Sequence, residues 1–224
     1  MMAGRLKQAF RDGTMTAISL AVLLAGSASR SAAGEQTASL TVSPPAERQA
    51  YMTVREPTRS PIGWVEFCIE NKSECAGEPS QPRDVVLTPR AWTDMLKVNA
   101  WVNQSIKPLT DIEHWGVIER WNYPDDGYGD CEDYVLLKRR MLMQAGWPRE
   151  ALLVTVVRDK KDEGHAVLTV RTDHGDFILD NQESDVLPWN KTGYRFVKRQ
   201  SQSDPNVWVL LGQPRPAPAT ASAR

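Results

Sequence analysis

The sequence predicts an α+β fold in which a helical first half packs on an antiparallel sheet formed by the second half. Apolar residues recur at helical spacing in two segments before Pro148. After Pro148, segments that are rich in β-branched residues or alternate in polarity replace this pattern. Helices followed by strands, rather than helices alternating with strands, indicate an α+β domain.

The first predicted helix covers residues 88–106. Thr88 is a suitable N-cap, and Pro89 occupies the first helical position, where its missing N–H leaves no hydrogen bond unmade. One largely apolar face then follows at helical spacing, made of Trp92, Met95, Leu96, Asn99, Val102 and Ile106.

The second predicted helix begins at Cys131, directly after Asp130, a residue type favoured at N-caps. Its buried side is supplied by Val135, Leu136, Leu137, Met141 and Leu142. Gly146 and Pro148 then end the helix, because glycine accepts the left-handed conformation at a C-terminus and proline cannot continue a helix.

Five strands are predicted in the second half of the chain. They cover residues 151–159, 165–172, 175–181, 194–200 and 207–212. A short turn at residues 173–175 separates the second of these strands from the third, which predicts a β-hairpin.

Changes in composition predict the domain boundaries. Residues 1–33 combine a basic start with an apolar run that is too short to cross a membrane, which predicts a secretory signal peptide. A buried core helix is the alternative, but the segment after the apolar run has nothing to bury. Residues 34–60 are expected to form a linker or an extended arm. The folded domain covers residues 61–211, and the low-complexity residues 212–224 form a tail predicted to be disordered.

If the protein is exported, disulfide formation becomes possible for its three cysteines. In an oxidising compartment, Cys68 and Cys75 are close enough in sequence to form a small disulfide loop. Two free thiols or half of a zinc site are the alternatives, and zinc would need more soft ligands nearby. A Cys68–Cys75 bridge leaves Cys131 as the odd thiol. The formal net charge of −1 gives no electrostatic reason to expect a nucleic-acid partner.

Cys131, His165 and Asp180 are the candidate catalytic residues. The amides and dipole at the start of a helix lower the pKa of a cysteine there. His165 and Asp180 lie at adjoining ends of the predicted hairpin, so they can be neighbours. If the Cys131 helix packs across that sheet, Cys131 as nucleophile, His165 as general base and Asp180, which orients the imidazole, lie together. Each residue also has an ordinary structural interpretation, as a helix-start thiol, a strand-edge histidine or a turn former.

The oxyanion donor is expected to be the Cys131 N–H, with Trp121 or Asn122 as a candidate partner.

The cysteine stands in an unusually acidic stretch. Five carboxylates occur within nine residues, namely Asp125, Asp126, Asp130, Glu132 and Asp133. Helix capping and turn formation account for some of them. The surplus is explained by calcium, which takes six to eight oxygen ligands, although the stretch is not an EF-hand loop. A bound cation would also offset the acids' effect on the thiol.

Three segments, "YGDCEDYVLLKRRMLMQAGWP", "GHAVLTVRT" and "FILDN", resemble the bacterial transglutaminase-like cysteine proteinase family, which includes the LapG-type periplasmic adhesin proteases. The resemblance covers residues 61–211. It implies a papain/transglutaminase-like fold in which the helical half carries the cysteine helix and packs on an antiparallel sheet. It also implies a triad of Cys131, His165 and Asp180.

The same resemblance implies calcium bound by the acids that flank the nucleophile, which are Asp130 and Glu132, with Asp133 as a further candidate. We therefore expect a calcium-dependent periplasmic cysteine peptidase that cleaves an envelope or surface protein, with an adhesin as the candidate substrate. An inner-membrane regulatory receptor is a candidate partner. Two alternatives remain open: acyl transfer to an amine by the same triad, and a non-enzymatic calcium-dependent module that binds an envelope partner.

Overall fold

A computed structural model describes residues 43–76 and 79–212 of the chain. The predicted signal peptide (1–33), the start of the predicted arm (34–42) and residues 213–224 of the predicted tail lie outside the described residues. Within the described ranges, no helix is both long enough and apolar enough to cross a membrane.

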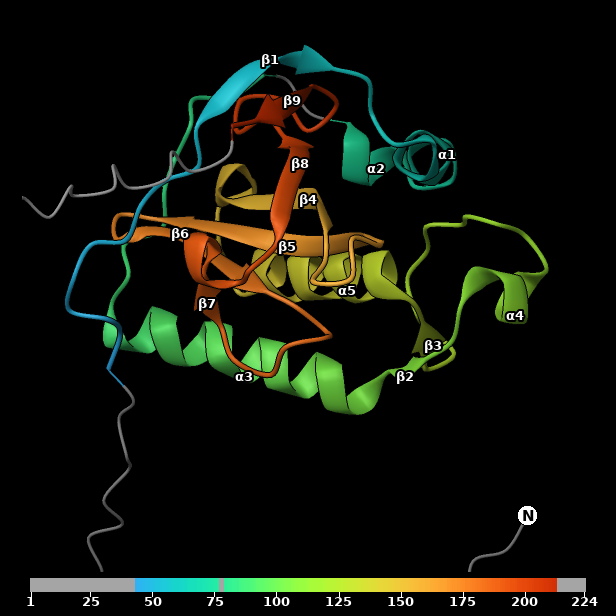
Figure 1. The fold of residues 1–224 in the computed structure, drawn as a ribbon, viewed down its shortest axis with the longest axis horizontal. Helices are drawn as coiled ribbons and strands as arrows, with labels where there is room; N and C mark the ends of the chain where they lie inside the picture. The colour runs from blue at the N-terminus through green and yellow to red at the C-terminus, as the bar shows by residue number, and fades with distance from the viewer. Residues whose placement is uncertain (1–42, 77–78, 213–224) are drawn as a thin grey trace, which may run out of the picture. The chain divides into compact units, whose positions relative to one another are not determined.

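A seven-stranded antiparallel sheet is the centre of the fold, with strand order β1-β9-β8-β4-β5-β6-β7 (Figure 1). Its central strands are β4 (Leu152–Arg158), β5 (Gly164–Thr172), β6 (Gly175–Leu179), β8 (Arg195–Gln200) and β9 (Trp208–Leu211). These five strands match the five predicted from the sequence, and β5 and β6 form the predicted hairpin, with Thr172 paired with Gly175. The α+β prediction is confirmed.

Two long helices cover one face of the sheet (Figure 1). They are α3 (Pro89–Ser105) and α5 (Cys131–Gln144), and both begin at the predicted residue. The Thr88 side chain caps α3 by accepting a hydrogen bond from the Ala91 N–H at 3.1 Å. Helix α5 packs directly on β4 and β5, and α3 packs on α5. The start of α5 is therefore held at the sheet.

Apolar residues fill both faces of the sheet. The helix-side core includes Trp92, Leu136, Ala166, Leu168 and Phe177. The far-face core, which contains no residue of α3 or α5, is made of Met52, Val157, Val167, Ile178, Trp189, Tyr194, Phe196 and Leu211. Because successive strand residues point to opposite faces, the alternation along β5 and β6 supplies both cores from the same strands.

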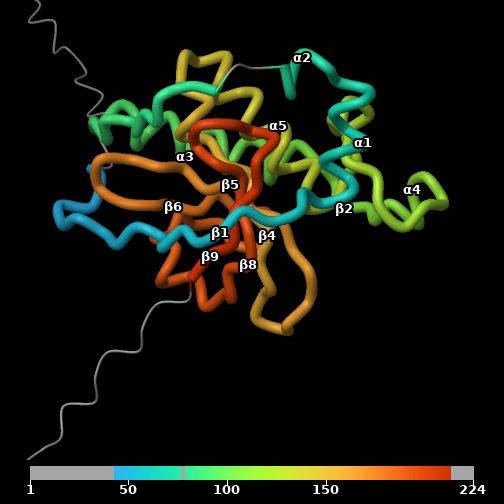
Figure 2. Tube along the Cα trace, turned by 90° about the horizontal axis from the view of Figure 1, so that it is seen from above, coloured from blue at the N-terminus to red at the C-terminus, as the bar shows by residue number. Residues whose placement is uncertain are grey.

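The folded part begins before Pro61, the boundary expected from the sequence. Strand β1 (Val54–Thr58) lies within the segment for which we predicted a linker or an extended arm, and it pairs antiparallel with β9. Figures 1 and 2 both show β1 alongside β9. Further back, the Met52 N–H donates to Asp176 Oδ2 at 2.8 Å. The arm is thus tied to the sheet at two places.

Several short elements have no counterpart in the predictions. They are α1 (Ile62–Glu70), α2 (Lys72–Cys75), β2 (Lys107–Pro108), α4 (Asp111–Trp115), β3 (Tyr128–Gly129), β7 (Leu187–Pro188) and two 3-10 turns, η1 (Arg149–Ala151) and η2 (Trp189–Lys191). The parallel pairing of β2 with β3 joins Pro108 to Gly129. It brings the start of α4 beside the segment that leads into α5.

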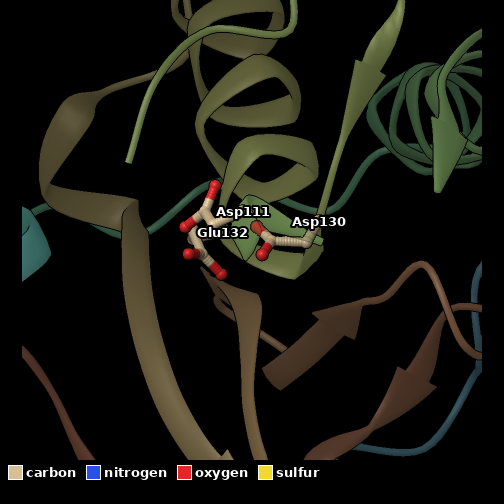
Figure 3. A group of neighbouring side chains, drawn as sticks. All are labelled: Asp111, Asp130 and Glu132. Atoms are coloured by element: carbon tan, nitrogen blue, oxygen red, sulfur yellow. The ribbon is translucent and has the colours of Figure 1, made fainter. Parts of the chain in front are cut away.

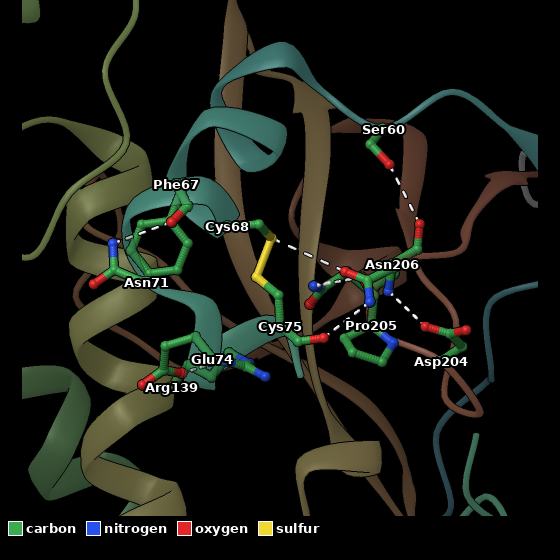
Figure 4. The surroundings of a disulfide bond; sticks show 11 residues. Ser60, Phe67, Cys68, Asn71, Glu74, Cys75, Arg139, Asp204, Pro205 and Asn206 are labelled. Carbon is green, nitrogen blue, oxygen red and sulfur yellow. Dashed lines mark hydrogen bonds and ion pairs between the residues drawn. A yellow bond between two sulfur atoms is a disulfide. The ribbon is translucent and has the colours of Figure 1, made fainter. Parts of the chain in front are cut away.

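Cys68 and Cys75 form a disulfide that joins α1 to α2 (Figure 4). The Asn206 side chain donates to the Cys75 carbonyl at 2.9 Å, which fixes the bridge to the loop between β8 and β9. On the other side, Glu74 pairs with the buried Arg139 of α5 at 3.2 Å. The disulfide therefore lies between two anchored parts of the fold.

Replacing both bridge cysteines, Cys68→Ser with Cys75→Ser, should lower the free energy of unfolding. A bridge over a sequence separation of 7 is worth about 2.5 kcal/mol by loop-closure entropy. Urea denaturation measures the loss, and a reducing agent should shift the wild type to the midpoint of the double variant while leaving the variant unchanged. Equal midpoints for the oxidised wild type and the double variant would contradict the expectation.

Candidate active site

His165 and Asp180 form a buried pair at one end of the β5–β6 hairpin. His165 is the second residue of β5, and Asp180 directly follows β6. The antiparallel pairing places the two side chains together, with His165 Nε2 2.8 Å from Asp180 Oδ1. Each side chain is only 2% exposed. The two residues that the sequence placed at adjoining strand ends thus lie within hydrogen-bonding distance.

Cys131 is the first residue of α5 and its side chain is half-buried. The N–H of Ala166, the neighbour of His165 in β5, donates to the Cys131 sulfur at 3.3 Å. The thiol itself donates to Glu132 Oε2 at 3.0 Å. Within the described part of the chain, the thiol makes no hydrogen bond with the His165 ring. In this arrangement the thiol is directed at a carboxylate.

Two cavities meet at Cys131, Gly164 and His165. One has a volume of about 310 Å³ and is also lined by Pro61, Glu119, Trp121, Glu132, Val156, Ala166 and Lys198. The other has a volume of about 460 Å³ and is also lined by Pro108, Leu109, Thr110, Glu113, Asp130, Asn181 and Gln182. Cys131 and His165 therefore border both cavities.

The environment of Cys131 favours the neutral thiol. Burial raises the pKa of Cys131, and the charges of Glu132 and Asp130 raise it further, although the Ala166 N–H acts in the opposite direction. From the helix start alone the sequence predicted a lowered pKa. In the structure, burial and two adjacent carboxylates act in the opposite direction and raise it.

Of the two ring nitrogens of His165, one is hydrogen-bonded to Asp180 and the other is not. Because Nε2 bonds Asp180, Nδ1 is left toward the cavity, where Gln182 Nε2 lies 3.4 Å away. Burial by itself would raise the pKa of Asp180, but hydrogen bonds from His165 and Tyr194 bring it below the ordinary value. Asp180 therefore remains a carboxylate that can orient the ring.

Three carboxylates converge beside the thiol, from Asp111, Asp130 and Glu132 (Figure 3). Each offers one oxygen, and these oxygens lie within 4.8 Å of one another. Asp111 is the first residue of α4 and reaches the group because β2 pairs with β3. The sequence did not single out Asp111, which lies inside a capping box of Thr110 and Glu113 and has the pattern of an ordinary first-turn acid.

Asp133, the third predicted metal ligand, lies outside this group. Its Oδ1 accepts a hydrogen bond from the Asn122 N–H at 2.9 Å. The side chain also packs so closely on Gly129 that a Cβ there would lie 2.7 Å from the Asp133 Cβ. Asp133 Oδ1 thus holds the loop before α5, while its Oδ2, like Asp130 Oδ1, is buried without a hydrogen-bond partner among the described residues.

The group of three carboxylates fits calcium. Burial and the charge of Asp130 raise the pKa of Glu132 to about 9, which shows how little the surroundings compensate its charge. Asp130 occupies the N-cap position of α5 but makes no capping hydrogen bond. Its Oδ1 is buried without a hydrogen-bond partner among the described residues. Carboxylate oxygens alone are a donor set for a hard cation such as calcium.

The remaining candidates have other partners. Trp121 Nε1 donates to Glu119 at 2.6 Å, which uses its one N–H. The Asn122 side-chain amide donates to the Tyr123 carbonyl at 3.1 Å, which uses one of its two N–H groups. The other two histidines are paired with neighbouring acids, His114 with Asp126 and His174 with Asp173.

Residues 54–216 match the family model described as bacterial transglutaminase-like cysteine proteinase. Three similar solved structures are of LapG from Legionella pneumophila. The EGTA-treated form is 27% identical and covers 54% of this chain and 70% of that chain, with a TM-score of 0.46. The calcium-bound form is 21% identical and covers 70% of this chain and 92% of that chain, with a TM-score of 0.47. A third LapG structure is 26% identical over 53% of this chain and 68% of that chain, with a TM-score of 0.44. No curated protein matches the chain.

Proposed function

The chain belongs to the bacterial transglutaminase-like cysteine proteinase family, and from this premise we propose that it is an exported cysteine peptidase that uses Cys131, His165 and Asp180. The observation that carries the proposal is the buried His165–Asp180 pair beside Cys131, at the point where two cavities meet. A nucleophile, a base and a group that orients the base are what acyl transfer through a thiol requires.

The proposed roles follow from the available atoms. The Cys131 sulfur attacks the peptide carbonyl, and its proton passes to His165 Nδ1, the nitrogen not engaged with Asp180. His165 then returns the proton to the departing amine, while Asp180 keeps the ring in place. The Cys131 N–H, one of the first amides of α5 and so without a partner within the helix, stabilises the oxyanion.

Glu132 links the proposed calcium site to the thiol. Its carboxylate belongs to the group with Asp111 and Asp130, and it also accepts the hydrogen bond from Cys131. Calcium held by these three residues would supply positive charge that offsets the carboxylates next to the thiol. With its carboxylate on the cation, Glu132 would no longer accept the hydrogen bond from Cys131, and the thiol proton would be free to pass to His165.

The cavities on two sides of the thiol suit a polypeptide that extends in both directions from the bond to be cleaved. We propose a protein substrate for this reason. A periplasmic location, a surface adhesin as that substrate and an inner-membrane receptor as a regulator are proposed from the family resemblance alone.

Incubating the purified protein with a peptide library, calcium and a fluorescent primary amine tests the proposal. We expect new peptide termini by mass spectrometry and no incorporation of the amine, because water accepts the acyl group in hydrolysis. Incorporation of the amine at glutamine without cleavage would instead indicate acyl transfer. A protein that gives neither product and whose Cys131 resists iodoacetamide would be a binding module and not an enzyme.

A further inference from the structure

We propose that Tyr194 is a positioning residue for the His165–Asp180 pair, an inference that rests on the proposed peptidase function. The Tyr194 hydroxyl donates to Asp180 Oδ2 at 2.6 Å. Its ring also meets the His165 ring edge to face, with centroids 5.9 Å apart and planes at 85°. A single side chain therefore contacts both the imidazole and the carboxylate that orients it.

The Asp180 carboxylate depends on this hydroxyl for one of its two oxygens. Oδ1 accepts from His165 Nε2 and from the Gln182 N–H at 3.0 Å. Among the described residues, the hydrogen-bond donor to Oδ2 is Tyr194. Because the Asp180 side chain is 2% exposed, bulk water has little access to replace a lost donor. Without the hydroxyl, a buried carboxylate oxygen would be left unpaired, a state that favours rotation of the group or uptake of a proton.

The nearest alternative source of compensation is Lys138 of α5. Its ammonium group is fully buried and near enough to Asp180 to interact with it electrostatically. However, Lys138 Nζ has no hydrogen-bond partner among the described residues. Burial lowers the pKa of Lys138 to about 7, which weakens its charge at neutral pH, and Lys138 does not fix the direction of the carboxylate. The geometric role is thus left to Tyr194.

The backbone around Tyr194 is itself fixed. The Tyr194 N–H donates to the Thr192 hydroxyl oxygen at 3.2 Å, and that hydroxyl donates to the Trp189 carbonyl at 2.9 Å. Gly193, between them, has a φ of +77°, which glycine adopts without strain. The ring is 8% exposed and belongs to the far-face core. Because Tyr194 is held in this way, its hydroxyl can keep the Asp180 carboxylate in one orientation.

Tyr194 approaches from the side of the sheet opposite to α5. Ala166 belongs to the helix-side core, and neighbouring strand residues point to opposite faces, so the His165 side chain lies on the face that Tyr194 covers. The nucleophile is thus carried by a helix on one side of the sheet, whereas Tyr194 reaches His165 and Asp180 from the far-face core.

Tyr194→Phe tests this role because it removes one oxygen and keeps the ring against His165. We expect kcat to fall roughly tenfold to a hundredfold, the range seen when groups that orient metal-ligating side chains are removed, while KM stays within about twofold. We also expect the far-downfield proton resonance of the His165–Asp180 hydrogen bond to shift or broaden in the free protein.

Tyr134→Phe is the matched control. Tyr134 is 3% exposed, and its hydroxyl donates to the Ile106 carbonyl at 2.7 Å, so this variant loses a comparable buried hydrogen bond away from His165. Both variants should lower the thermal midpoint, Tyr194→Phe by at least as much as Tyr134→Phe because its partner is a carboxylate. Only Tyr194→Phe should change kcat and the resonance. Unchanged kcat and resonance in Tyr194→Phe, or the same changes in Tyr134→Phe, would overturn the proposal. Because the resonance is read without substrate, a chain that cleaves nothing but shows the Tyr194-specific shift would reject the peptidase and retain the positioning role.

Discussion

Replacing Cys131 with Ala should abolish peptide cleavage and leave the fold intact. No other described side chain offers a free thiol, since Cys68 and Cys75 are joined. Loss of the nucleophile of a triad lowers kcat by roughly 10⁴-fold or more. The side chain is only half-buried, and its sulfur makes two polar contacts, with Ala166 and Glu132. We therefore expect a change of no more than about 1–2 kcal/mol in the free energy of unfolding.

Cleavage assays and thermal denaturation of the same preparations separate activity from folding. Cys131→Ser is the companion variant, because a hydroxyl can keep the contacts with Ala166 and Glu132 but is a far weaker nucleophile at that position. Both variants should be inactive, and Cys131→Ser should be closer to the wild type in thermal midpoint. Residual hydrolysis by Cys131→Ala above the rate of a blank would refute the assignment of the nucleophile.

Removing calcium should destabilise the protein markedly. If calcium binds only the folded chain, calcium at a hundred times its dissociation constant adds about 2.7 kcal/mol to the free energy of unfolding. In a domain of this size, that corresponds to roughly 5–10 °C in the thermal midpoint. The physical reason is that Asp111, Asp130 and Glu132 concentrate three carboxylates in a largely buried place, where a bound cation would stabilise their ionised forms. Scanning calorimetry with calcium and with EGTA measures the difference.

Three isosteric variants locate the ion. Asp111→Asn should abolish the calcium-dependent shift, since it removes one of the three converging charges. Asp125→Asn is the matched control from the same acidic stretch, because Asp125 is exposed and pairs with Arg140 at 3.2 Å. Asp133→Asn should also keep the shift. If Asp133→Asn loses the shift and Asp111→Asn retains it, the sequence-based ligand set is right and the group in the structure is not the site.

Local signals made much of the fold predictable. Thr88 and Pro89 fix the start of α3 by capping and by a suitable first-turn φ, both of which depend on adjacent residues alone. The strands β4 and β5 are visible in the sequence because β-branched and alternating residues fill surfaces that are buried on one or both faces. The contact between His165 and Asp180 follows from the hairpin, whose register is set by a short turn.

The residues that escaped prediction are those placed by contacts between distant segments. Asp111 reaches Asp130 only because two residues of β2 pair with two of β3, a pairing too short to leave a pattern in the sequence. Tyr194 directly precedes β8, a strand that is not adjacent to β6, and a single aromatic residue there has the pattern of core packing. Asp133 stands out in the sequence only as one more acid beside Cys131, and no local pattern indicates that the distant Asn122 N–H donates to its carboxylate.

The pairing of β1 with β9 has a consequence for the behaviour of the protein in solution. Strand β9 has the apolar sequence WVLL, and without β1 its backbone donors and acceptors would form an open sheet edge that invites pairing between chains. Strand β1 closes that edge and presents Arg55, Glu56 and Pro57 in its place, residue types that discourage further strand addition. Strand β1 therefore protects the sheet against pairing between chains, and a chain shortened to Pro61 would lose that protection along with its first strand.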